Sequence, residues 1–97
     1  MTLKEERITK LLSALDLERR GWTVVDHWEA DTCAIGLARP SDLRRLVYVS
    51  TFNKAAGRYD YECELPSGPE DTEYESTDRR EDVTYDELVK ALERHLS

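Results

Sequence analysis

Glycine, proline and cysteine are scarce in this sequence, which has four, three and two of them among 97 residues. The glycines stand apart from one another, so neither of the common glycine-rich phosphate-binding motifs occurs. The two cysteines and two histidines show no metal-ligand spacing, and we expect neither a metal nor a cofactor. No apolar run approaches the roughly 18 residues of a membrane-spanning helix, and the charged N-terminus lacks the apolar segment of a secretory signal. These absences predict a cytoplasmic protein.

Basic side chains are missing from the stretch between Arg58 and Arg79, which contains eight acidic residues. The whole chain has 14 basic and 21 acidic side chains, and its net charge is −7. Residues 1–49 are balanced, so the second half carries the entire excess. Such a surface repels nucleic acid and anionic lipid and attracts basic proteins. The charge therefore predicts a basic protein partner, although an acidic face that only keeps the protein soluble is an alternative.

Apolar residues with helical spacing begin and end the chain. They predict one helix over residues 3–19, with Thr2 and Glu5 as its capping box and Gly21 at its end. A second helix begins near Thr84, which forms a capping box with Glu87. Each helix has one apolar stripe, so each must cover another layer of structure.

Between the helices the hydrophobic period changes to two. The predicted strands cover residues 22–29, 33–38, 46–52 and 58–65, with a short fifth strand at 72–76. The links are short, so neighbouring strands should be antiparallel. We therefore expect one α+β domain over residues 1–97, in which a meander sheet is covered by both helices on one face.

The strand at residues 58–65 alternates most regularly. Tyrosine, cysteine and leucine point one way, and acidic residues point the other way at steps of about 7 Å. With the apolar side under the helices, the acidic side stands on the open face of the sheet. Tyr74, between two acids, is the expected exposed aromatic anchor. The predicted partner-binding residues are Asp60, Glu62, Glu64, Glu73, Tyr74 and Glu75.

The remaining reactive side chains predict no catalytic site. Cys33 and Cys63 are expected as reduced core thiols, with a disulfide or a reactive thiol as alternatives. His27 is expected on the polar side of a strand, and His95 either as a cation at the end of the last helix or as a merely exposed residue. No nucleophile, base and oxyanion pocket come together, so we expect no enzyme.

A family resemblance rests on the helix–meander–helix order, on the strand end at residues 48–53 and on the strand at residues 58–64. In this pattern the chain resembles the small acidic immunity proteins that bacteria make against polymorphic or contact-delivered toxins. Such proteins bind a toxin domain, often a nuclease, and block its active site or a neighbouring surface. The resemblance implies that the acidic strand and its flanking acids meet lysines and arginines of a toxin, with Tyr74 as the anchor.

Other classes of function stay open. A nucleic-acid mimic would use the same acidic row to inhibit a DNA-binding enzyme. A chaperone-like assembly protein would use an exposed sheet face or helix. A ligand-binding or enzymatic domain would use the open face beside Ala34, Gly36 and Ala38, with His27 as its titrating group.

Overall fold

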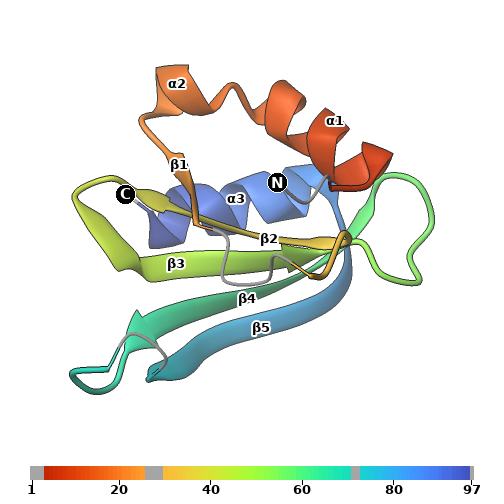
Figure 1. The fold of residues 1–97 in the computed structure, drawn as a ribbon. Helices are drawn as coiled ribbons and strands as arrows, with labels where there is room; N and C mark the ends of the chain where they lie inside the picture. The colour runs from red at the N-terminus through yellow and green to blue at the C-terminus, as the bar shows by residue number, and fades with distance from the viewer. Residues whose placement is uncertain (1–3, 26–29, 71–72, 97) are drawn as a thin grey trace.

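Five strands form one antiparallel sheet, and their order in the sheet is their order in the sequence. The computed structural model describes residues 4–25, 30–70 and 73–96 (Figure 1). The strands are β1 (Thr23–Val25), β2 (Ala34–Arg39), β3 (Asp42–Ser50), β4 (Arg58–Pro66) and β5 (Tyr74–Thr84). The helices are α1 (Glu6–Leu15), α2 (Leu17–Arg20) and α3 (Tyr85–His95). The predicted α+β meander, with helices at both ends, is confirmed.

Helices α1 and α3 lie on the same face of the sheet and form a second layer (Figure 1). Their apolar stripes meet the inward side chains of β2 to β5 in one core. The core residues are Ile8, Leu11, Leu15, Trp22, Ile35, Leu37, Val47, Val49, Tyr59, Tyr61, Cys63, Val83, Leu88, Ala91, Leu92 and Leu96. Because Tyr59, Tyr61 and Cys63 point into this core, the acidic side of β4 faces away from the helices.

The N-terminal helix is shorter than the predicted span of residues 3–19. It ends at Asp16, whose φ of 52° lies in the left-handed region that aspartate tolerates better than most residues. Arg20 Nε then donates to the carbonyl of Leu15 over 2.7 Å, which satisfies one end of the broken helix. Glu5 precedes α1 but no side-chain cap bond forms there, and Thr2 lies outside the described residues. Gly21, with φ of 73°, follows α2 as predicted.

The C-terminal helix begins where the sequence predicts. Thr84 accepts a hydrogen bond from the backbone of Glu87 over 3.2 Å, and the Glu87 carboxylate accepts from Thr84 N over 3.0 Å. The last turn is held by two arginines of the sheet. Arg45 Nε donates to the carbonyl of His95 over 2.8 Å, and Arg39 donates to that of Leu96 over 3.3 Å. These bonds fix the open end of α3 to β2 and β3.

Three strand predictions need correction. β5 has 11 residues, twice the predicted length, because its pairing with β4 continues through a charged segment. β3 ends at Ser50, so Phe52 is not a strand residue and its side chain is 69 % exposed. The small residues Ala34, Gly36 and Ala38 are all buried, so β2 does not offer the open face expected beside them. The predicted strand at residues 22–29 is described only as far as β1.

Candidate partner-binding surface

A concavity of about 350 Å³ lies on the open face of the sheet, over β3, β4 and β5. Most of its lining side chains are charged or aromatic. They include Asp31, Tyr48, Phe52, Asp60, Glu62, Arg79, Arg80 and Glu81. Four acidic residues against two arginines leave an acidic excess in this lining, and one of the four, Glu81, is paired with Arg79 over 3.6 Å. The surface is therefore suited to a positively charged partner.

Strand register brings these residues together. Tyr48 lies across from Glu62, and Glu62 lies across from Arg79, in one row over three strands. Asp60 lies across from Ser50 in the next row. The pairing of β4 with β5 shifts register next to Asp60, and such a bulge increases the twist of the sheet. The curvature of the twisted sheet therefore places Asp60 and Glu62 in a hollow.

Asp60, the first acid of the predicted row, is held by neighbours. Its Oδ1 lies 3.2 Å from Lys54 Nζ and accepts a hydrogen bond from the backbone of Asp82 over 2.9 Å. Asp82 has a φ of 55°, so the carboxylate fixes a left-handed residue in β5. Asp60 therefore has a structural role, and its charge is already partly compensated by Lys54.

The carboxylate of Glu62, the second acid, makes no hydrogen bond or ion pair with the residues that the structure describes. It is half-buried in the floor of the concavity. The pKa of the neighbouring Tyr48 is raised mainly by burial, and a hydrogen bond from Ser50 opposes that rise. The negative charge of Glu62 raises the pKa of Tyr48 further, as do the charges of Asp31 and Asp60. Glu62 is therefore the carboxylate most available to a basic group of a partner.

Glu64, the third acid, lies outside the concavity at the other end of β4. Its Oε2 is buried and has no hydrogen-bond partner among the described residues. Burial raises the pKa of Glu64, and the neighbouring charge of Glu62 raises it further. The three acids of β4 are thus on one face as predicted, but their environments differ.

Tyr74 is not the exposed anchor that the sequence suggested. Its side chain is half-buried and its hydroxyl oxygen is fully buried. Arg44 of β3 covers the ring, with the guanidinium carbon 5.8 Å from the ring centre. The same guanidinium group donates to the carbonyls of Gly68, Glu70 and Glu73. Arg44 therefore holds Tyr74 together with Gly68, Glu70 and Glu73.

The acids beside Tyr74 have separate positions. The Glu73 carboxylate accepts a hydrogen bond from the backbone of Glu70 over 3.1 Å, and it lies where a side chain on Gly68 would stand. Glu75 is exposed on β5. Neither residue lines the concavity on the open face. The structure therefore divides the six predicted residues into two places, with Asp60 and Glu62 in the concavity and the others near the loop.

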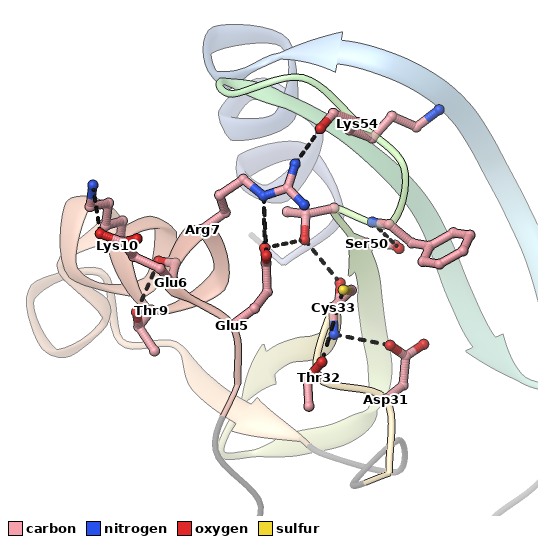
Figure 2. Close-up of polar contacts among 12 residues, drawn as sticks. Glu5, Glu6, Arg7, Thr9, Lys10, Asp31, Thr32, Cys33, Ser50 and Lys54 are labelled. Carbon is pink, nitrogen blue, oxygen red and sulfur yellow. Dashed lines mark hydrogen bonds and ion pairs between the residues drawn. The ribbon is translucent and has the colours of Figure 1, made fainter.

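A polar network beside the concavity links α1 to the end of β3 (Figure 2). The Glu5 carboxylate accepts from Thr51 Oγ1 over 2.6 Å and from Arg7 Nε over 3.0 Å. Arg7 also donates to the carbonyl of Lys54, and the backbone of Thr51 donates to that of Cys33 over 2.9 Å. The network fixes the loop that follows β3 and thus one wall of the concavity.

Phe52 is the residue at this site that sequence reasoning missed. Its spacing placed it with the apolar residues of a longer third strand. A signal against that reading was present in Asn53 and Gly57, two residue types typical of turns, and both have positive φ, 58° and 78°. The chain leaves the sheet before Phe52, and the ring stands in solvent beside the acidic residues.

The histidine prediction is wrong for His95, and His27 lies outside the described residues. His95 is only 7 % exposed, and its Nε2 lies 3.0 Å from the carbonyl of Glu64. Burial lowers its pKa, and the hydrogen bond to Glu64 opposes that shift. A buried imidazole with a lowered pKa is neutral near pH 7, so His95 is part of the packing and is not a helix-end cation.

Both cysteines are free thiols. Cys63 is buried, and burial raises its pKa to about 11, with Asp78 adding to the shift. Cys33 is only half-buried. The expectation of a core thiol is therefore confirmed for Cys63, and the disulfide alternative is not formed.

Over the ranges that the structure describes, no group of three or more histidine, cysteine or acidic side chains is arranged to hold a metal ion. Among the described helices, none has both the length and the apolar character needed to cross a membrane. The chain was also compared with protein-family models, with curated proteins and with solved structures, and none of the three comparisons found a match.

Proposed function

We propose that the chain is a non-enzymatic binding protein that neutralises a basic protein, in the manner of an immunity protein acting on a toxin domain. The observation that carries the proposal is the acidic concavity on the open face of the sheet. There Asp31, Asp60, Glu62 and Glu81 outnumber Arg79 and Arg80. The resemblance to acidic immunity proteins supports a toxin domain, such as a nuclease, as the partner class.

The position of the concavity favours binding on this face. A sheet covered by helices on one side presents its other side as a rigid platform, and side chains on strands are held more firmly than those on loops. Negative charges on such a platform speed encounter with a basic partner and orient it. The acids can therefore cover lysines or arginines with which a toxin binds its own substrate.

The alternative functions have weaker support. A nucleic-acid mimic needs an uninterrupted series of negative charges, but Arg79 and Arg80 interrupt the concavity. A ligand site beside Ala34, Gly36 and Ala38 lacks an open surface, because these three residues are buried. An assembly chaperone would need a larger apolar surface than the exposed ring of Phe52 provides among the described residues of this face.

The test is co-expression of the tagged chain with the products of its neighbouring genes, followed by elution with increasing salt. We expect a stoichiometric complex with a basic protein, whose Kd rises at least about tenfold when Glu62→Lys and Glu81→Lys are combined. Salt should weaken the wild-type complex more steeply than the variant complex. The wild-type chain recovered alone, or a complex indifferent to both substitutions, would refute the proposal.

The choice of variants matters, because charge reversal at two acids of β4, Asp60 and Glu64, would disturb the fold itself. Asp60→Lys would break the bonds to Lys54 and Asp82, and Glu64→Lys would place an ammonium group in a half-buried corner. Glu18→Lys is the matched control, since Glu18 is exposed on α2, away from the open face. Glu75→Lys then reports whether the binding surface extends along β5.

A further inference from the structure

We infer that Phe52 is the anchor of this binding surface, and that the partner presents a small apolar pocket flanked by lysines or arginines. The inference rests on the proposed function and specifies the chemistry of the partner. A ring that is 69 % exposed is unusual for phenylalanine. Within residues 4–25, 30–70 and 73–96, the other large exposed apolar side chains are Leu43, at 49 %, and Val24, at 40 %. Neither of those two lines the acidic concavity.

The ring stands between two depressions. It lines the acidic concavity and also a shallower hollow of about 560 Å³ formed with Ala30, Asp31, Thr32 and Cys33. An exposed ring that borders two hollows can insert into a pocket of a partner protein, and the rim of that pocket can then occupy the hollows. Buried aromatic side chains at the centre of an interface contribute the largest share of binding energy, provided that surrounding contacts exclude water.

The backbone that carries the ring is fixed before any partner binds. Phe52 N donates to Ser50 Oγ over 3.1 Å, and Lys54 N donates to the Thr51 carbonyl over 3.1 Å. The side chain of Thr51 is fully buried and donates a hydrogen bond to the Glu5 carboxylate. Little backbone freedom is therefore left to lose on association, and the ring itself has only two rotatable bonds.

The charges around the ring decide between a basic partner and a second copy of this chain. Phe52 shares its concavity with four carboxylates and two guanidinium groups. Two copies meeting through this face would bring surfaces of the same net sign together, which is unfavourable. A pocket flanked by lysines or arginines would meet Glu62 and Asp31 while it covers the ring. Charge complementarity therefore selects a basic partner.

The first experiment places a photoreactive side chain at the ring in the source cell. Phe52→p-benzoylphenylalanine is compared with Leu43→p-benzoylphenylalanine, whose site is exposed at the start of β3. We expect position 52 to cross-link to a different protein, at an apolar segment with lysine or arginine within a few residues, and position 43 to leave that protein unlabelled. Cross-links from position 52 to this chain alone, or none, would overturn the inference.

The second experiment measures Kd for the neighbour-encoded protein that co-purifies with the wild-type chain. Phe52→Ala should raise Kd about 30-fold or more, Phe52→Leu should raise it less, and Leu43→Ala should leave it unchanged. The salt dependence should stay that of the wild type in Phe52→Ala, because no charge is removed. Thermal unfolding of each variant verifies that the exposed position tolerates the change.

The outcomes separate the two proposals. If the Glu62 and Glu81 reversals weaken the complex but Phe52→Ala does not, the anchor inference fails and the proposed function stands. If Phe52→Ala weakens the complex and the reversals do not, the acidic-surface function fails and so does the basic pocket inferred here. If no complex forms with the wild-type chain, both fail.

Discussion

The hydroxyl of Thr51 donates to Glu5 Oε1 over 2.6 Å, and this bond ties the N-terminus of α1 to the end of β3. Thr51 is fully buried, and the other contacts of the Glu5 carboxylate come from Arg7, at 3.0 and 3.2 Å. Since Phe52 follows Thr51 directly, the same bond holds the proposed anchor in place. The residue that precedes α1 thus holds a residue 46 positions later, at the start of the loop that follows β3.

Removal of that hydroxyl tests how much the network stabilises the fold. Thr51→Val keeps the volume and removes the donor, so the Glu5 carboxylate loses one charge-assisted bond. We expect the free energy of unfolding to fall by about 1.5–3 kcal/mol in urea titrations, the range for hydrogen bonds to charged groups. Thr51→Ser keeps the donor and should lose less. A change below about 0.5 kcal/mol for Thr51→Val would show that the bond contributes little.

The two thiols should differ in reactivity. Cys63 is 2 % exposed and has its pKa raised to about 11, so almost none of it is thiolate at pH 8. Cys33 is half-buried. With an aromatic disulfide reagent at pH 8, we expect one thiol to react in the folded protein and two in denaturant. Cys33→Ser should abolish the reaction of the folded protein, and Cys63→Ser should leave it. Two equally fast thiols would contradict this assignment.

Local patterns predicted the parts of the fold in which local chemistry dominates. The alternation in β4 identified its two faces, and Thr84 with Glu87 identified the start of α3. The length of β5 could not be read in the same way. Residues 78–82 are all charged and show no alternation, and their strand conformation depends on pairing with β4.

The candidate site could be predicted only in part, because the exposure of some of its residues also depends on contacts that are distant in the sequence. Parity placed Asp60 and Glu62 on the open face, and both line the concavity. Tyr74 was expected to be exposed because its sequence neighbours are acidic, yet Arg44 reaches it from β3, 30 positions away. Contacts of that range leave no local pattern, so the burial of Tyr74 and the exposure of Phe52 required the tertiary structure.

The pH dependence of Glu64 should be opposite to that of a salt-bridged acid. Its pKa is raised in the folded state by burial and by Glu62, above the unfolded value of about 4.3. Its stabilising contribution is therefore complete below about pH 4.3 and is lost as pH rises through the folded pKa. Glu64→Gln should raise the unfolding temperature by a few degrees at pH 7 and give no advantage at pH 4. The exposed Glu75→Gln is the control.

His95 should make the protein less stable as the pH falls. Burial lowers its pKa in the folded state below the unfolded value of about 6.5, so the unfolded chain binds the proton more readily. The contribution of the neutral imidazole to the stability of the fold is complete above about pH 6.5. It is lost as the pH falls through the lowered pKa of the folded state. The measurement is the free energy of unfolding of the wild type and of His95→Gln between pH 7.5 and pH 5. Glutamine can still donate to the Glu64 carbonyl but does not titrate.

The difference between the two proteins isolates His95, because every other titrating group is present in both. We expect the stability advantage of the wild type over His95→Gln to shrink steadily as the pH falls. The groups around the imidazole explain why its pKa is lowered, since Arg45 and Arg94 add to the effect of burial and disfavour the charged form. Only the hydrogen bonds to the carbonyls of Glu64 and Leu46 oppose them. An advantage that grows toward pH 5 would mean that the folded protein stabilises the imidazolium, and the buried neutral state assigned to His95 would be wrong.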